Sequence, residues 1–219
     1  AAEGTFNKET KTWIGRGFPE IMKNGGFDCV IGNPPYITIT LGKKQEIFTS
    51  NEINYFKKKY TKIFEYKNNT YNFFIDKSIS VIKPGGALGY IVPSTLLLND
   101  TASKIRHWLV NETTIDVLIK FKYRVFENAE IGGSLILVLT KTGCDIKQKV
   151  LAAEVDSIEK FSNLVYEEIL QSKYCNEKSK IYLSNKRIDF INSVYKVPNR
   201  PLGDFVDIYQ GVITGDNKK

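Results

Sequence analysis

Two consecutive prolines, Pro34 and Pro35, directly follow the apolar run Phe27–Gly32 and constrain the fold more than any other feature of this sequence. A short apolar run that ends in glycine is typical of a strand buried in a parallel sheet. Proline has no N–H group for a sheet ladder, so the chain must leave the sheet here. We therefore predict a buried strand over residues 27–32, followed by a turn with free backbone carbonyls.

The rest of the chain alternates between helical and extended patterns. Apolar residues at helical spacing predict helices within 51–66 and over 71–82, 101–111 and 157–171. Apolar runs predict strands over 87–92, 115–121, 134–139 and 150–155. The Lys83–Gly86 segment is expected to stop the second helix, and the sequence from residue 174 onward looks polar and irregular. The alternation predicts an α/β sheet with right-handed crossovers.

The composition excludes several classes of protein. With 42% hydrophobic residues among 219 and no apolar run of about 18, the chain has enough apolar residues for a core but none of the spans that cross a membrane. The first residues match neither a signal nor a transit peptide. Three separated cysteines and one histidine, His107, predict no zinc site and no disulfide framework, which fits a reducing cytoplasm. We expect His107 to be structural.

The positive charge is concentrated in two segments. The chain carries a net charge of +7, and residues 38–70 and 171–219 each contribute +4, while the remainder sums to −1. Such a distribution is expected of a protein that binds a polyanion on one face, although two solvated loops would give the same pattern. Lys57, Lys58 and Lys59 are accordingly either phosphate contacts or the solvated face of a helix.

The turn after the first strand contains groups that could bind a specific chemical group. The side-chain oxygen of Asn33 and the backbone carbonyl of Pro34 are two acceptors that the prolines hold in a fixed relation, and together they fit one exocyclic NH₂ group. Tyr36 offers a face for the ring that bears this amine. A base in duplex DNA would have to leave the helix to reach such a pocket. Taken alone, the four residues could equally be a turn with a surface tyrosine.

Residues 27–37 resemble the catalytic motif of adenine-N6 DNA methyltransferases, most closely that of the fused, type IIG-like restriction-modification enzymes. The Asn-Pro-Pro-Tyr motif also occurs in glutamine-N5 protein and guanine-N2 RNA methyltransferases, so other segments must discriminate. Segments similar to the family's later motifs, in order and spacing, are found at 69–77, 82–86, 89–94, 124–129 and 202–217.

The resemblance implies a partial Rossmann-like class I methyltransferase sheet, namely its second half, and a role for each matched residue. In the site that it implies, Asn33, Pro34 and Pro35 form the turn that holds the adenine amine, Tyr36 and Phe126 enclose the flipped adenine, Ser94 lies near the pocket, and Phe74 lies against the adenine of S-adenosylmethionine. Stacking of this kind contributes about 1–3 kcal/mol per base.

The resemblance also divides the chain into parts. It implies an N-terminal leader over 1–26, the catalytic half of a methyltransferase domain over 27–142, a connecting region over 143–199 and the start of a DNA-specificity domain over 200–219. Gly15-Arg16-Gly17 reads as a loop rather than as the family's cofactor loop. We therefore expect a central part of a longer polypeptide that does not bind S-adenosylmethionine alone. Its exposed strand edge is expected to self-associate or to be covered by the first 26 residues.

The function expected from the sequence is site-specific adenine-N6 methylation of double-stranded DNA by a bacterial, cytoplasmic restriction-modification enzyme, possibly fused to a nuclease. Two alternatives stay open at this point. One is a DNA-binding or scaffolding segment with a vestigial pocket, and the other is a glutamine-N5 protein methyltransferase. The recognition sequence does not follow from these residues.

Overall fold

The structure is a computed structural model that describes residues 5–7, 12–14, 18–40, 47–126, 133–175, 180–198, 200 and 202–207. Gly15-Arg16-Gly17 and the end of the specificity-like segment, from residue 208 onward, lie outside the described residues. The chain forms two compact units, Ala1–Asn185 and Lys186–Lys219. No helix within the described part is both long enough and apolar enough to span a bilayer.

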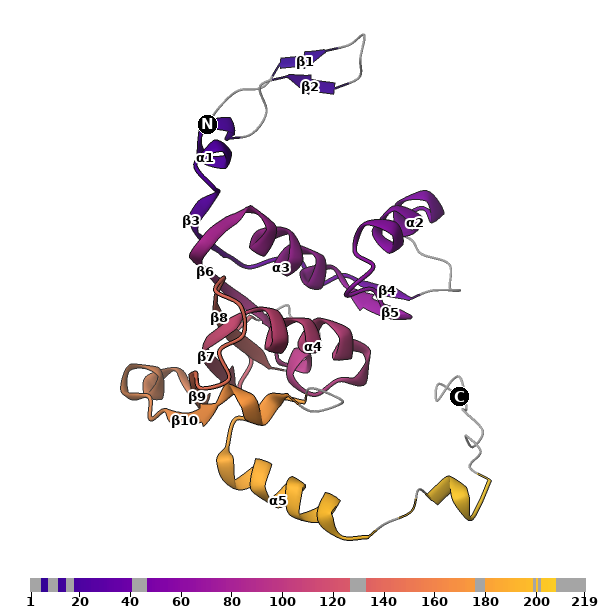
Figure 1. Ribbon diagram of the computed structural model, residues 1–219, viewed down its shortest axis with the longest axis vertical. Helices are drawn as coiled ribbons and strands as arrows, with labels where there is room; N and C mark the ends of the chain where they lie inside the picture. Colours follow the sequence, from indigo (N-terminus) through magenta and orange to yellow (C-terminus); the bar gives the residue numbers. More distant parts are fainter. Residues whose placement is uncertain are drawn as a thin grey trace, which may run out of the picture. The chain divides into compact units, whose positions relative to one another are not determined.

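A six-stranded mixed sheet forms the centre of the first unit (Figure 1). Its strands, in spatial order, are β10 (Glu167–Leu170), β9 (Lys149–Val155), β7 (Thr114–Phe121), β8 (Ser134–Thr140), β6 (Ile82–Pro93) and β3 (Phe27–Gly32). The predicted strands over 27–32, 87–92, 115–121, 134–139 and 150–155 are therefore confirmed. The sheet takes strands from both sides of residue 142.

The strand directions place the carboxyl ends of β3, β6 and β7 on the same side of the sheet, where the strands end. β3 pairs parallel with β6, whereas β8 pairs antiparallel with both β6 and β7. β6 and β7 therefore run in the same direction as β3. In an open α/β sheet, ligands bind beyond the carboxyl ends of such strands.

Two helices form the crossovers between these strands. The α3 helix (Thr70–Val81) connects the region after β3 to β6, and the α4 helix (Ser103–Glu112) connects β6 to β7. Both helices lie on the same face of the sheet (Figure 1). The buried side chains on these elements include Ile75, Ile79, Leu88, Ile105, Leu109, Leu118, Leu137 and Leu139. Burial of these side chains anchors the helices to the sheet.

The Lys83–Gly86 segment differs from the prediction. It was expected to separate a helix from a strand, but it lies inside β6, where the register shifts between Phe27 and Cys29 of the neighbouring strand. Gly85 has a φ of 78°, and a Cβ at Gly86 would lie 2.7 Å from the carbonyl oxygen of Asp28. The glycines thus form an irregularity that the strand tolerates rather than a break in it.

The predicted helix over 157–171 is wrong. The segment forms a 3-10 helix, η3 (Ile158–Asn163), then the edge strand β10, then the start of another 3-10 helix, η4 (Gln171–Tyr174). β10 pairs antiparallel with β9, and β9 pairs parallel with β7. Pairing with a strand more than ten residues earlier overrides the local apolar spacing, because strand propensity depends on the neighbours that a strand finds.

The segment between β3 and α3 forms a small layer of its own. The α2 helix (Ser50–Lys59) begins at a capping box, in which Thr49 and Glu52 satisfy each other's backbone N–H groups. β4 (Thr38–Thr40) and β5 (Lys67–Asn69) flank it and pair antiparallel, with Thr38 opposite Asn69. Rings of α2 and its C-cap stack on Phe73 of α3, with centroids 5.1 Å away for Phe56 and 4.7 Å away for Tyr60.

The first unit also includes the N-terminal elements. β1 (Thr5–Asn7) and β2 (Thr12–Ile14) pair with each other, and α1 (Pro19–Lys23) leads into β3. Among the described strands, β3 has one partner, β6. The side chain of Ile31 on this strand is 83% exposed. Whether a second copy of the chain covers this edge stays a prediction.

The second unit contains regular structure that the sequence patterns did not predict. Most of α5 (Asn185–Lys196) belongs to it, together with a short 3-10 helix, η5 (Leu202–Asp204). The expectation of an irregular segment from residue 174 onward is therefore wrong. Large apolar side chains of α5, such as Phe190 and Tyr195, are exposed.

Candidate functional site

The Asn33–Tyr36 turn begins directly at the carboxyl end of β3. The last residue of this strand, Gly32, pairs with Tyr90 of β6. The Asn33 side chain is exposed, Pro34 is buried and Tyr36 is half-buried. The turn is therefore anchored through one proline and presents its amide to solvent. This is the position at which an open α/β sheet binds its ligand.

The hydroxyl group of Tyr36 connects the turn to β6. Its oxygen lies 2.6 Å from Oδ1 of Asn33 and 2.9 Å from the carbonyl oxygen of Ile91. A phenol has one proton, so it donates to one of these two acceptors at a time. Burial raises the pKa of Tyr36, which keeps the hydroxyl protonated and therefore a donor. The hydrogen bond from Tyr36 fixes the orientation of the Asn33 side-chain amide, which the sequence analysis predicted as an acceptor.

Thr70 holds the turn on both sides of Tyr36. Its hydroxyl donates to the Pro35 carbonyl at 2.5 Å and accepts from the Ile37 N–H at 3.1 Å. The Thr70 N–H in turn donates to the Ile37 carbonyl at 2.9 Å. These three bonds occupy the polar backbone groups next to Tyr36. Within the described residues, no hydrogen bond reaches the carbonyl of the buried Pro34.

A second tyrosine packs against the first. The ring of Tyr71 meets that of Tyr36 edge-on, with centroids 6.2 Å apart and planes at 90°. Tyr71 is only 3% exposed, and burial raises its pKa to about 12 despite a hydrogen bond with the Thr95 side chain. The Asn33–Tyr36 turn therefore packs against a neutral, buried aromatic ring that belongs to α3.

Ser94 follows the carboxyl end of β6, just as the Asn33–Tyr36 turn follows the carboxyl end of β3. It begins the 3-10 helix η1 (Ser94–Leu97), directly after β6, and its N–H donates to the Gly133 carbonyl at 3.1 Å. Gly133 has a φ of 73°, and a Cβ there would lie 2.9 Å from Oγ of Ser94. Glycine is thus needed before β8 so that the two segments can meet.

The two phenylalanines of the predicted site lie on different elements. Phe126 is half-buried and follows β7, so it lies beyond the carboxyl end of a strand that runs parallel to β3. The residues directly after it, 127–132, lie outside the described part of the chain. Phe74 projects from α3 and is 46% exposed, so its ring is accessible to a ligand.

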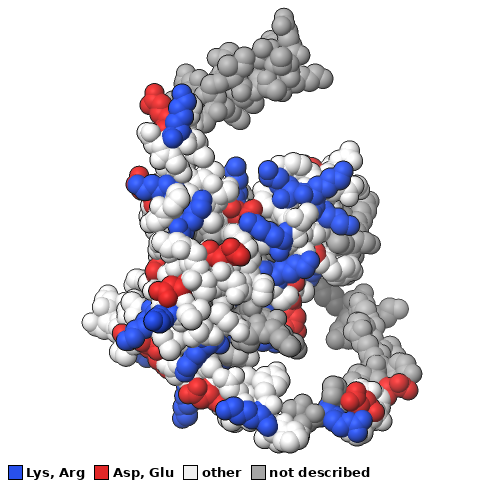
Figure 2. All heavy atoms as spheres, in the orientation of Figure 1, with Lys and Arg blue, Asp and Glu red and all other residues white. Residues whose placement is uncertain are grey.

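The three consecutive lysines lie in the last turn of α2. Lys57, Lys58 and Lys59 are all exposed, and basic side chains gather over this helix (Figure 2). Their position at the helix C-terminus complements the helix dipole. No buried residue lies on α2, so the helix is a surface element. These observations fit both a phosphate contact and a solvated helix face, so DNA binding by Lys57, Lys58 and Lys59 stays a prediction.

Thr70, Tyr71 and the Ile91 carbonyl were not singled out from the sequence. Thr70 follows Asn69, which caps α3 by accepting from the Tyr71 N–H at 3.4 Å. A helix start that contacts a turn more than 30 residues earlier leaves no local signal. The proximity of the β4 and β5 segments, which bracket this contact, appears only in the folded chain.

The sequence pattern of the Eco57I restriction-modification methylase family matches residues 3–126, which is more than half of the chain. The chain belongs to the Eco57I restriction-modification methylase family. The match therefore covers the Asn33–Tyr36 turn, α2, α3 and the strands β3, β6 and β7, the elements that build the candidate site.

Two relatives illustrate the range of this similarity. The chain is 28% identical over 206 residues to the type II restriction enzyme and methyltransferase RM.Eco57I of Escherichia coli, covering 91% of this chain and 20% of that protein. It is 35% identical over 91 residues to the type II methyltransferase M.TthHB8I of Thermus thermophilus, covering 42% of this chain and 21% of that protein. The chain thus spans about a fifth of the length of these relatives.

A solved structure has a similar fold. The type IIG restriction endonuclease BpuSI superposes with a TM-score of 0.55 at 14% identity, over 78% of this chain and 23% of that protein. At this level of identity the likeness concerns the fold alone. The mixed α/β architecture described above is therefore similar to part of that restriction endonuclease.

Proposed function

We propose that this chain forms the base-binding part of a DNA methyltransferase that transfers a methyl group to the N6 amine of an adenine flipped out of double-stranded DNA. The whole enzyme is proposed to act in a restriction-modification system. The observation that carries the proposal is the Asn33–Tyr36 turn, in which a fixed amide oxygen and the Pro34 carbonyl follow the end of β3. Membership of the methylase family supports it.

The chemistry follows from the two acceptors. The amine of adenine is planar and shares its lone pair with the ring. If Asn33 Oδ1 and the Pro34 carbonyl each accept one of its N–H protons, the nitrogen becomes more tetrahedral and its lone pair more available. Tyr36 holds Asn33 in place through its hydroxyl. Acceptors that are already oriented need no reorganisation during the reaction, which is the basis of electrostatic catalysis.

The remaining predicted residues keep their proposed roles. Tyr36 and Phe126 are proposed to enclose the flipped adenine, and Ser94 to lie beside it. Ring stacking of this kind contributes about 1–3 kcal/mol per base. In the present structure the Tyr36 ring contacts Tyr71 edge-on, which leaves the rest of the ring to a ligand. The side chains proposed to contact phosphates are Lys57, Lys58 and Lys59.

Phe74 is proposed to form one wall of the site for the methyl donor. Phe74, at 46% exposed, is an aromatic surface to which the adenine of S-adenosylmethionine would bind. When bound, this cofactor supplies an electrophilic methyl group. Among the described residues, Phe74 is the one for which we propose a contact with this cofactor. We therefore expect calorimetry on this chain alone to detect no micromolar binding of S-adenosylmethionine, and micromolar binding would contradict this expectation.

Asn33→Ala in the methyltransferase that carries this chain tests the proposal. Removal of one oriented acceptor should lower kcat by at least about a hundredfold, while binding of duplex DNA, measured by fluorescence anisotropy, stays within about threefold. Asn111→Ala, on the outer part of α4, is the matched control and should retain full activity. Retention of most activity by Asn33→Ala would refute the assignment and favour a DNA-binding segment with a vestigial pocket.

A further inference from the structure

Two of the three cysteines lie side by side in the fold, although β9 and β10 separate them in the sequence. Cys144 follows β8, and Cys175 is the C-cap residue of η4. Both are free thiols, and the side chain of Cys175 is within hydrogen-bond distance of the Cys144 side chain. We call these two residues the thiol pair. The third cysteine, Cys29, is exposed on β3, at the opposite edge of the sheet from β10.

Gln171 contacts both sulfur atoms of the thiol pair. Its Nε2 atom lies 3.7 Å from Sγ of Cys144, and its backbone carbonyl accepts a hydrogen bond from the Cys175 thiol at 3.8 Å. Gln171 is fully buried. Because protein interiors are closely packed, this residue gives the two thiols a fixed common neighbour.

The amide of Gln171 is fixed by the junction between α4 and β7. Its Nε2 atom donates to the carbonyls of Val110 and Thr113 at 2.8 and 2.7 Å, and its Oε1 atom accepts from the Ile115 N–H at 2.8 Å. An amide nitrogen has two protons, so these two carbonyls use its donors. The contact with Cys144 is therefore weak, and the Cys144 sulfur stays available for reaction.

Both cysteines are anchored through the residues that precede them. The Thr114 hydroxyl donates to the Gly143 carbonyl at 2.8 Å, which fixes the segment before Cys144 to the first residue of β7. Tyr174 is fully buried, and its hydroxyl donates to the Tyr182 carbonyl at 3.1 Å. The backbone next to each thiol is therefore held in position.

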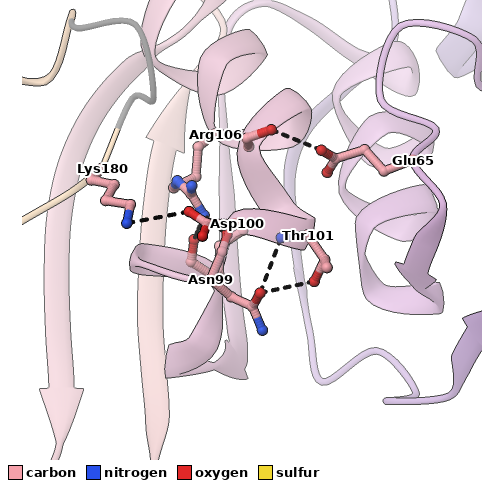
Figure 3. A network of polar contacts seen from close by, with 8 residues as sticks. Glu65, Asn99, Asp100, Thr101, Arg106 and Lys180 are labelled. Atoms are coloured by element: carbon pink, nitrogen blue, oxygen red, sulfur yellow. Dashed lines mark hydrogen bonds and ion pairs between the residues drawn. The ribbon is translucent and has the colours of Figure 1, made fainter. Parts of the chain in front are cut away.

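The chain that continues from Cys175 is anchored at its next described residue. Lys180 forms an ion pair with Asp100 at 3.2 Å (Figure 3). Arg106, which is fully buried, donates to the carbonyl of the neighbouring Asn99 and so holds this segment. Figure 3 shows Lys180 and Arg106 reaching the segment around Asp100 from two different parts of the chain. Cys175 thus lies between two anchored points.

We propose that the thiol pair is a site of reversible oxidation, at which a low-molecular-weight disulfide such as oxidised glutathione converts Cys144 and Cys175 into one disulfide bond. The exposed Cys175, as the thiolate, attacks the oxidant and forms a mixed disulfide, and one glutathione leaves as a thiolate. The Cys144 thiolate then attacks the Cys175 sulfur and displaces the second glutathione. The protein loses two electrons and two protons, and the oxidant becomes two glutathione thiols.

The arrangement favours the second step over reaction with another molecule. A group held in contact with its partner reacts as if it were present at a very high concentration. The sulfur atoms of a disulfide are about 2.05 Å apart, so the two thiols must come closer, and rotation of the exposed Cys175 side chain provides this approach. Burial and the neighbouring Cys144 raise the pKa of Cys175, so its thiol is protonated near neutral pH and stays reduced until an oxidant accumulates.

The disulfide would close a loop that contains β9 and β10, the two strands at one edge of the sheet. β10 has a single described partner, β9, so a second attachment would hold this strand more firmly. The thiol pair follows the end of β8, which is antiparallel to β6, and so lies away from the Asn33–Tyr36 turn, at the amino ends of β6 and β7. This assignment therefore does not depend on the proposed function.

Peptide mapping of the whole protein that carries this chain tests the site. The protein is treated with oxidised glutathione at mildly alkaline pH, its remaining thiols are alkylated, and its tryptic peptides are identified by mass spectrometry. We expect the peptide of residues 142–147 to be joined to that of residues 174–178 with the loss of two hydrogen atoms. Dithiothreitol should separate the two peptides again. Cys29 should carry one glutathione or one alkyl group instead.

Two serine variants provide the controls. Cys175→Ser should leave no joined peptide, whereas Cys29→Ser should form it to the same extent as the wild type. If glutathione is bound separately to Cys144 and to Cys175, or if both are still alkylated after prolonged oxidation, the two thiols form no disulfide and the inference is wrong. The wild-type peptide map decides this even if Cys175→Ser fails to fold.

Hydrogen exchange measures what the cross-link does to the fold. In the oxidised wild type, the amides of β10 should exchange about tenfold more slowly than in the reduced protein, because a cross-link restricts local opening. The difference should vanish on addition of dithiothreitol, be retained in Cys29→Ser and be missing in Cys175→Ser. Equal exchange in the oxidised and reduced wild type would show that the disulfide does not hold β10 and would contradict this effect.

Discussion

The catalytic turn and the lysines of α2 are both proposed to meet DNA, but the fold holds them in opposite ways. The turn is fixed by hydrogen bonds to residues far away in the sequence, through Tyr36 to β6 and through Thr70 to α3. The α2 helix has no buried residue and is attached through aromatic rings that stack on Phe73. A group that orients an amine needs a defined position, whereas a charge that attracts phosphates needs only to be exposed.

Among the substitutions that test this comparison, we expect Thr70→Val to have the largest effect. The change removes the hydroxyl that bonds to Pro35 and Ile37 and leaves a partly buried N–H without its acceptor. We expect a loss of about 1–3 kcal/mol in the free energy of unfolding and a fall in kcat of up to about a hundredfold from misplacement of the turn. Urea unfolding and single-turnover kinetics provide the two measurements.

Thr61→Val is the matched control, because Thr61 is exposed in the turn after α2. It should change neither quantity. If Thr70→Val were fully active, the hydrogen bonds around Tyr36 would not be what positions Asn33, and the contrast with α2 would lose its basis.

A smaller effect is expected when Lys57, Lys58 and Lys59 are all replaced by alanine. Affinity for duplex DNA should fall by about tenfold at 0.1 M salt, and the slope of log K against log salt should become shallower by about 0.9 for each lysine that contacts a phosphate. The value of kcat at saturating DNA should not change. A triple replacement of three other exposed lysines serves as the charge-matched control, namely Lys23, Lys77 and Lys147.

An equal loss of affinity in both triple variants would show that the α2 lysines act through net charge alone. A lower kcat in the α2 variant, with unchanged affinity, would place the helix in the catalytic machinery and contradict the division between the two regions.

The smallest effect is expected for Tyr36→Phe. The ring and its contact with Tyr71 remain, but the donor to Asn33 and to the Ile91 carbonyl is lost. We expect kcat to fall by about threefold, as for one neutral hydrogen bond of about 0.5–1.5 kcal/mol, with little change in KM for DNA. A variant as active as the wild type would show that the prolines alone orient Asn33.

The pH dependence provides an independent check on the same hydroxyl. Burial raises the pKa of Tyr36, so the neutral donor form persists above the ordinary value of about 10. The wild-type kcat should therefore show no decrease due to this group up to about pH 10. A decrease with a midpoint below that pH, present in the wild type and missing in Tyr36→Phe, would contradict the raised pKa.

The sequence was a good guide where local pattern and tertiary structure agree. The strand that ends at Gly32 and the α3 helix were predicted to within a residue or two, because apolar periodicity and the following prolines determine them. The position of Asn33 at a strand end follows from the same pattern. The role of Thr70 could not be predicted, because its partners lie more than 30 residues earlier.

The secondary-structure predictions were wrong where pairing with another strand determines the local structure. The segment over 157–171 has the spacing of a helix, but β10 forms there because β9 offers an unpaired edge. The Lys83–Gly86 segment contains the residues of a turn, but it lies within β6 between Ile82 and Ala87, which both pair with β3, and Gly85 and Gly86 form backbone hydrogen bonds with Lys141. The α5 helix was missed although Ile188, Ile191 and Tyr195 recur at helical spacing, and its exposed apolar side chains include Phe190, Val194 and Tyr195.

The position of β3 at the edge of the sheet couples assembly to chemistry. Only one side of this strand is bonded to another described strand, although the strand ends at the residue before Asn33. Amide hydrogens of β3 should therefore exchange with solvent sooner than those of β8, which has a partner on each side. Any polypeptide that pairs with the second side of β3 would make the strand before Asn33 more rigid, so that assembly would affect the binding that we propose for Asn33.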